Sequence, residues 1–184
     1  MKKSKPFTGL GDEGTSGLLG EGRFLKSHFR FEVLGSIEEL SAILGLVKSA
    51  LTDEALKLDI TNIQSMLYGL MAQLSVVDPV TCEVPMITDE SVHFLEKRMD
   101  LLSAGLERPA GFIIPGDSMQ SALVDYARTF TRRVERRIVE LDEMQKTANP
   151  AILPFINRLS SYLFVLELYT IKTLDRSSPT MVKK

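Results

Sequence analysis

The sequence predicts an all-α protein with five helices, organised as a single domain over residues 1–184. Three observations carry this prediction. Apolar side chains recur at helical spacing in five separate segments, which glycine or proline signals divide. No stretch alternates convincingly as a strand would, and the chain shows no internal repeat. With 44% hydrophobic residues, 184 residues are enough to bury a sizeable core.

Glycine dominates the first part of the chain, where six of the 12 glycines lie between Gly9 and Gly22. Residues 9–14 match the pattern G-x-G-x-x-G, but no strand precedes them and no Walker sequence follows, so neither phosphate-binding fold is supported. Two interpretations stay open for residues 1–30: a disordered tail, or a flexible loop that wraps phosphate groups. The loop would use its backbone N–H groups together with Thr8, Thr15, Ser16 and the cation of Lys26.

Two helices are expected in the next part of the chain. Ser36 and Glu39 form a capping box after Gly35, so the first helix is predicted to begin at Ser36. Its apolar residues are Ile37, Leu40, Leu44, Val47 and Leu51. Asp53 caps the second helix, which ends near Asp78-Pro79 because the residue before proline avoids the helical conformation. Its buried residues are predicted to be Leu56, Ile60, Ile63, Leu67, Leu70 and Leu74.

The third helix follows a loop at residues 78–88 and is capped by Thr88 or Asp89. It is predicted to end at Gly105 and to bury Val92, Leu95, Met99 and Leu102. Residues 107–116 then form an irregular segment. Its apolar run at 112–114 lies before a Pro-Gly turn signal, which fits a short strand or a buried loop.

The fourth helix is expected over residues 118–144, with Asp117 or Ser118 as its cap. One face is apolar and carries Met119, Leu123, Tyr126, Phe130, Val134, Ile138 and Leu141. The opposite face carries Arg128, Arg132, Glu135 and Arg136. Guanidinium groups suit phosphate oxygens and carboxylates. The alternative is a solvated face with Glu–Arg pairs along the helix.

The fifth helix is predicted from about Phe155 to Leu174, after the break at Asn149-Pro150. Apolar residues cover most of its circumference, which is typical of a helix at the centre of a bundle or at an interface. A polar tail over residues 177–184 follows.

Composition excludes several function classes. A net charge of −2 argues against a nucleic-acid partner, and no apolar run is long enough for a membrane span. The single cysteine, Cys82, permits no internal disulfide and fits a reducing compartment, so a cytoplasmic location is expected. The only histidines are His28 and His93, too few for a zinc site, and no metal-binding residues are predicted. An enzyme of this kind would rely on positioning a substrate that brings its own reactivity.

Several motifs together resemble the PduO-type ATP:cob(I)alamin adenosyltransferases. They begin with the glycine loop, Arg23 with Lys26, and the run at 35–40, and continue with Ile63-Gln64 and the segment at 112–116. They end with the arginine cluster at 127–136 and Asn157-Arg158-Leu159-Ser160. Their order and spacing extend from about Thr8 to Tyr169.

The resemblance implies an up-and-down five-helix bundle that assembles as a homotrimer and transfers the 5′-deoxyadenosyl group of ATP to the cobalt of cob(I)alamin. The resemblance implies that the protein binds ATP, Mg²⁺ together with the triphosphate, and cobalamin. It also implies a possible partner, an adenosylcobalamin-dependent enzyme that accepts the product. The product would make this an enzyme of vitamin B12 biosynthesis. The implied catalytic residues are Arg132, the intersubunit arginine Arg128, and Phe112, the aromatic that displaces the lower cobalt ligand. The implied ATP-binding residues are Thr8, Gly11, Asp12, Thr15, Ser16, Lys26, Arg132, Arg133, Glu135, Arg136 and Asn157.

The chain also departs from the family pattern in the glycine loop. Gly9 and Leu10 stand where the family usually has a cation and a hydroxyl, which predicts weak ATP binding. Ser41, Ser161 and Asp117 are further departures. An active transferase is favoured, and the alternative is a divergent member that binds ATP or corrinoid without turnover, as a sensor or a cofactor-delivery protein.

Overall fold

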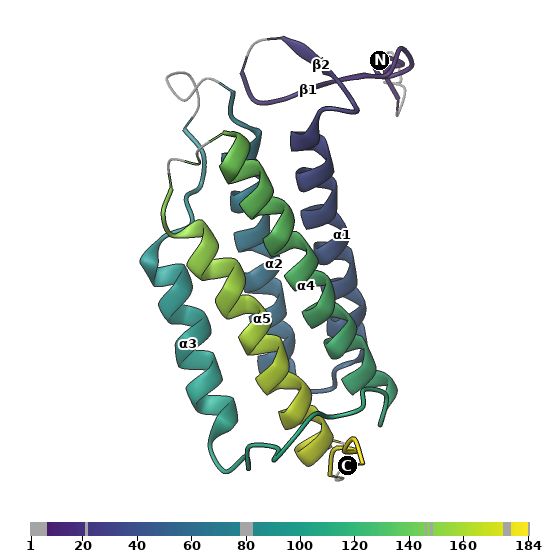
Figure 1. Ribbon diagram of the computed structural model, residues 1–184, viewed down its shortest axis with the longest axis vertical. Coiled ribbons are helices and arrows are strands. Elements are labelled where there is room, and N and C mark those ends of the chain that lie inside the picture. Colours follow the sequence, from purple (N-terminus) through teal and green to yellow (C-terminus); the bar gives the residue numbers. More distant parts are fainter. Residues whose placement is uncertain are drawn as a thin grey trace, which may run out of the picture.

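The computed structural model describes residues 7–20, 22–77, 83–145, 147, 149–174 and 178–183. In this part of the chain five α-helices lie roughly along the long axis of the molecule, with a small hairpin at one end and the C-terminus at the other (Figure 1). The helices are α1 (Phe29–Ala50), α2 (Glu54–Ser75), α3 (Asp89–Ser103), α4 (Met119–Met144) and α5 (Ile152–Tyr169). The hairpin consists of β1 (Thr15–Gly17) and β2 (Arg23–Leu25), and a short π-helix, η1 (Thr170–Leu174), extends α5.

These elements confirm the predicted five helices, with one correction. The glycine-rich segment contains a two-stranded antiparallel sheet in which Thr15 pairs with Leu25 and Gly17 with Arg23. Each strand has only three residues, which is too short for alternation to be recognised in the sequence.

Helix α1 begins seven residues before the predicted start at Ser36, at Phe29. His28 is its N-cap, and the imidazole Nδ1 accepts a hydrogen bond from Arg30 N at 3.2 Å. Ser36 lies inside the helix, where it is buried and its hydroxyl donates to Val33 O. The capping-box prediction failed because the apolar spacing of Phe29, Val33 and Ile37 continues upstream of Ser36, so the first two turns are stabilised by packing.

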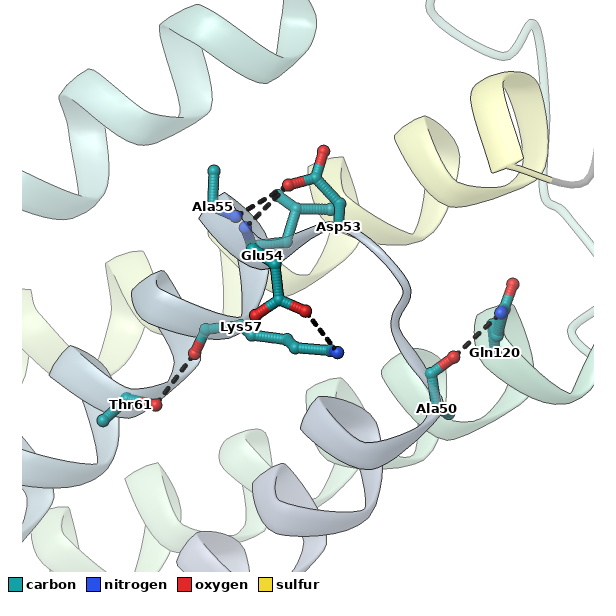
Figure 2. A network of polar contacts seen from close by, with 8 residues as sticks. Ala50, Asp53, Glu54, Ala55, Lys57, Thr61 and Gln120 are labelled. Carbon is teal, nitrogen blue, oxygen red and sulfur yellow. Dashed lines mark hydrogen bonds and ion pairs between the residues drawn. The ribbon is translucent and has the colours of Figure 1, made fainter.

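The turn between α1 and α2 confirms the predicted cap at Asp53 (Figure 2). Its carboxylate Oδ1 accepts hydrogen bonds from Ala55 N at 2.8 Å and Leu56 N at 3.2 Å. Nearby, the side chain of Gln120 in the first turn of α4 donates to Ala50 O at 2.8 Å, which satisfies a carbonyl at the C-terminus of α1. All six predicted apolar residues of α2 are buried. The predicted stop at Asp78-Pro79 and the residue Cys82 lie outside the described residues, and α2 itself ends at Ser75.

Helix α3 begins after Thr88, as predicted, and ends at Ser103, two residues before Gly105. An ion pair ties it to α2, because Arg98 Nη2 lies 2.7 Å from Oδ2 of the buried Asp59. Burial raises the pKa of Asp59, and the hydrogen bond from Arg98 opposes this rise. Removing either partner would leave the other charge poorly solvated, so the pair also fixes how α3 sits on the bundle.

Helices α4 and α5 form the centre of the bundle: α4 packs on α1 and α5, and α5 also packs on α3 (Figure 1). The central position predicted for α5 is confirmed, although α5 begins at Ile152 and not at Phe155. The apolar stripe of α4 needs a correction in its first half. Met119 and Tyr126 are 75% and 50% exposed, whereas Val124 and Ala127 are buried. Small inward residues such as Ala127 let neighbouring helices approach closely, so the buried face is offset from the bulkiest side chains.

Candidate functional site

The glycine loop is an organised hairpin with its own hydrogen bonds. The Arg23 guanidinium on β2 reaches across it: Nη2 donates to Leu10 O at 2.6 Å and to Thr15 O at 2.9 Å, and Nε donates to Thr15 Oγ1 at 3.0 Å. Lys26 Nζ donates to Gly11 O at 2.9 Å. Over the residues that the structure describes, the disordered-tail interpretation is therefore wrong. The charged side chains of Arg23 and Lys26 donate hydrogen bonds to loop carbonyls and so hold the loop in one conformation. The glycine content alone did not indicate these hydrogen bonds.

The hairpin is anchored to the end of α2. Leu19 N donates to Ser75 O and Val77 N donates to Leu19 O, each at 2.9 Å. This anchoring places the glycine loop at one end of the bundle (Figure 1). The loop contains six of the predicted ATP-binding residues, which are Thr8, Gly11, Asp12, Thr15, Ser16 and Lys26. Lys26 differs from the expectation in one respect, since its ammonium group already binds a loop carbonyl.

The arginine face of α4 is exposed at Arg132, Arg133 and Arg136. Arg133 lies over the Phe130 ring, 5.0 Å from its centroid. Among the described residues, Arg132 and Arg136 form no hydrogen bond or ion pair. The alternative interpretation requires Glu–Arg ion pairs along this face, and in the described part of the chain Arg132 and Arg136 do not form them. Two guanidinium groups are available for an external anion.

Glu135 and Asn157 connect this face to α5. Asn157 Nδ2 donates to Glu135 Oε1 at 2.9 Å, and Asn157 Oδ1 accepts from Arg158 Nη1 at 3.1 Å. Arg158 in turn donates through Nε to Glu96 on α3 at 2.8 Å. The predicted residues Glu135 and Asn157 therefore meet between α4 and α5. Arg132 and Arg136 are exposed on α4 near them in sequence, and Arg133 lies over the Phe130 ring of its own helix.

Arg128 has a different environment from the other arginines. Its Nη2 lies 2.7 Å from Asp125 Oδ1, and its Nε lies 4.0 Å from Glu167 Oε2. Sequence reasoning missed both carboxylates. Asp125 was within reach of a search, because it lies three residues before Arg128 on the same helix. The only sign of Glu167 in the sequence is that it is a single charged residue within the apolar run of α5.

Phe112 lies in the segment between α3 and α4, and 86% of it is exposed. Of the two predicted alternatives for this segment, the buried loop is thus wrong. The C-terminal segment holds the backbone: Val182 N donates to Phe112 O at 2.9 Å and Ile114 N donates to Thr180 O at 2.7 Å. Thr180 also donates to Asp117, and these hydrogen bonds lower the pKa of that carboxyl. Residues 180–182 of the predicted polar tail therefore pair through backbone hydrogen bonds with residues 112–114.

One chain presents the predicted residues as separate groups. The glycine loop lies at the hairpin end of the bundle, and Phe112 belongs to the α3–α4 connection near the C-terminus (Figure 1). No hydrogen bond or ion pair within the described ranges joins the loop to the arginine face of α4. The same residues contain no cluster of three His, Cys, Asp or Glu side chains that could hold a metal ion. None of their helices combines the length and apolarity of a membrane span.

Comparison with known proteins gives a consistent family. A family model for cobalamin adenosyltransferases matches residues 6–170. The corrinoid adenosyltransferase of Bacillus subtilis is 37% identical over 164 residues, covering 87% of this chain and 83% of that protein. The corrinoid adenosyltransferase PduO of Salmonella typhimurium is 34% identical, and this chain spans 48% of its length.

A solved structure agrees with the fold. A variant PduO-type ATP:corrinoid adenosyltransferase from Lactobacillus reuteri, complexed with cobalamin and ATP, matches with a TM-score of 0.89 and 27% identity over 98% of this chain and 100% of that one. Since the family model spans most of the sequence and the Bacillus protein is closely related over its length, the chain belongs to the cobalamin adenosyltransferase family, as the motifs predicted.

Proposed function

We propose that this chain transfers the 5′-deoxyadenosyl group of ATP to the cobalt of cob(I)alamin, giving adenosylcobalamin and triphosphate. The observation that carries this proposal is the pair of exposed guanidinium groups, Arg132 and Arg136, beside the hydrogen-bonded Glu135 and Asn157. Relatives of the chain are named corrinoid adenosyltransferases, and a structural neighbour holds both substrates.

The reaction needs positioning and charge stabilisation more than acid–base chemistry. The electron pair of cob(I)alamin forms the Co–C5′ bond, and the electrons of the C5′–O bond leave with the triphosphate. No proton is transferred, which fits a site without a histidine base. Negative charge grows on the leaving triphosphate, where Arg132 and Arg136 would stabilise it. Mg²⁺ would arrive with the triphosphate, since phosphate oxygens supply the ligands that it prefers.

The complete site would lie between subunits of a homotrimer. Support comes from the contacts within one chain: among the described residues, no hydrogen bond or ion pair joins the loop residues Thr8–Lys26 to the arginine face of α4. The loop of one subunit would close over ATP held by the α4–α5 surface of its neighbour. The exposed ring of Phe112 would face the corrin. An acceptor enzyme for the product and a cytoplasmic location remain predictions.

A non-catalytic binding protein is the second candidate. The loop favours it in one respect: Leu10 is 65% exposed at a position where a hydroxyl donor is expected, and Lys26 is engaged with Gly11. Both features would lower the affinity of the loop for the triphosphate of ATP. Turnover separates the two candidates, because a binding protein would take up ATP without forming adenosylcobalamin.

The test is Arg132→Ala, followed by the visible spectrum of reduced cobalamin with Mg-ATP. Turnover should fall by about 10²–10³-fold, as for the loss of one charge-stabilising donor. Helical circular dichroism should stay unchanged, because Arg132 lies outside the buried face of α4. Arg108→Ala is the matched control, since Arg108 is exposed in the α3–α4 connection. Wild-type turnover in Arg132→Ala, or failure of this variant to fold, would refute the assignment.

A further inference from the structure

Glu167 is a fully buried acidic side chain in the most apolar helix of the protein. Its relative exposure is 0%, and neither carboxylate oxygen has a hydrogen-bond partner among the described residues. An ionised carboxylate in such a place loses its hydration without replacement, which is strongly unfavourable. The group therefore needs either a proton or a closer cation.

The charged groups facing Glu167 come from α4 and from the turn before it. Arg128 is the nearest cation, with Nε 4.0 Å from Glu167 Oε2. However, Arg128 is already engaged, because Nε and Nη2 lie 2.8 and 2.7 Å from Asp125 Oδ1. Asp117 adds a more distant negative charge. One guanidinium group thus stands before two carboxylates and makes close contact with only one of them.

We infer that Glu167 is a positioning residue for Arg128, and that its protonation state decides which of the two carboxylates holds the guanidinium group. With Glu167 protonated, Arg128 stays on Asp125, at the distances of 2.8 and 2.7 Å given above. When the proton leaves, the buried charge attracts the guanidinium inward across the 4.0 Å gap, and the Asp125 contact is weakened.

Glu167 is expected to lose its proton near neutral pH. Burial raises the pKa of Glu167 to about 7, and the Asp125 carboxylate adds to the rise while Arg128 opposes it. The family resemblance implies that Arg128 is an intersubunit catalytic residue, so on the proposed function assembly or turnover would become pH-linked there. The inference itself rests on the geometry of Asp125, Arg128 and Glu167, and its test uses no turnover.

The first measurement is a carbon-13 NMR titration of the glutamate side-chain carboxyls in the full-length protein. One resonance should titrate near pH 7 and be missing from Glu167→Gln. In Arg128→Gln this midpoint should move higher, because the opposing cation is gone. Arg137→Gln is the matched control on the same helix, since Arg137 pairs with Glu32 and Glu140 instead. A midpoint near the ordinary value of about 4.3, or one that ignores Arg128→Gln, would overturn the inference.

The second measurement is thermal unfolding against pH. The folded protein keeps the Glu167 proton up to about pH 7, whereas the unfolded chain releases it at lower pH. Stability should therefore fall, relative to Glu167→Gln, as the pH rises from about 5 to about 8. Glu143→Gln, at an exposed position on α4, should keep the wild-type dependence. Parallel curves for wild type and Glu167→Gln would contradict the inference.

Discussion

Arg23 shows how single residues compensate for the unusual loop of this chain. Its guanidinium bonds both arms of the loop, at Leu10 and at Thr15, from the opposite strand of the hairpin. The loop is thus partly ordered before nucleotide arrives, which lowers the entropic cost of binding. Restoring a cation at position 9 would not be a simple gain. Gly9 has φ +73°, and a side chain there would cost roughly 1–2 kcal/mol in the left-handed conformation.

Replacing Arg23 with alanine should therefore loosen the loop without unfolding the bundle. We expect faster proteolysis within residues 8–26 of the free protein. We also expect about tenfold weaker ATP binding, the scale of one lost charge-assisted hydrogen bond. Limited proteolysis and calorimetric titration measure the two effects. Arg108→Ala, which removes an exposed arginine far from the hairpin in sequence, serves as the control. Unchanged proteolysis and affinity in Arg23→Ala would show that the hydrogen bonds at Leu10 and Thr15 do not hold the loop.

At the scale of elements, the sequence predicted those features that depend on neighbouring residues. The helical spacing of α2 and the caps at Asp53, Thr88 and Ser118 are local, and the structure confirms them. The start of α1 and the inward face of α4 were misjudged, since tertiary packing there overrides a local capping pattern and side-chain size. The pairing of residues 112–114 with 180–182 joins distant parts of the chain, and no local pattern announces it.

Two helix glycines give a matched test of the packing between elements. A Cβ at Gly45 on α1 would meet only Gln64 Nε2 at 3.7 Å, which is an ordinary contact. A Cβ at Gly69 on α2 would lie 3.3 Å from Pro85 O, in a tight contact with backbone. We expect Gly45→Ala to raise the free energy of unfolding by about 0.5–1 kcal/mol, the usual helix gain over glycine.

Gly69→Ala should gain less than Gly45→Ala or be destabilising, because Pro85 must shift. Chemical denaturation of the two variants beside the wild type gives both values. Equal stabilisation in the two variants would contradict the close approach of the residue 85 segment to α2.

At the scale of the whole molecule, the parts of the candidate site could be predicted from the sequence, whereas the way in which they come together could not. The glycine loop and the arginine helix are contiguous in sequence, so their residue types revealed them. The approach of the buried Glu167 to the Asp125–Arg128 pair arises only when α4 packs on α5. The proposed closure of a loop from one subunit over the α4–α5 surface of another depends on contacts between chains, which no intrachain pattern encodes.

The proposed activity meets its most direct test in the visible spectrum of the wild-type protein mixed with reduced cobalamin and Mg-ATP. Because the Co–C bond forms only if the adenosyl group is transferred, the spectrum of cob(I)alamin should convert to that of adenosylcobalamin and triphosphate should be released. A cob(I)alamin spectrum that persists while calorimetry shows bound ATP would contradict the proposed transferase and leave a binding protein.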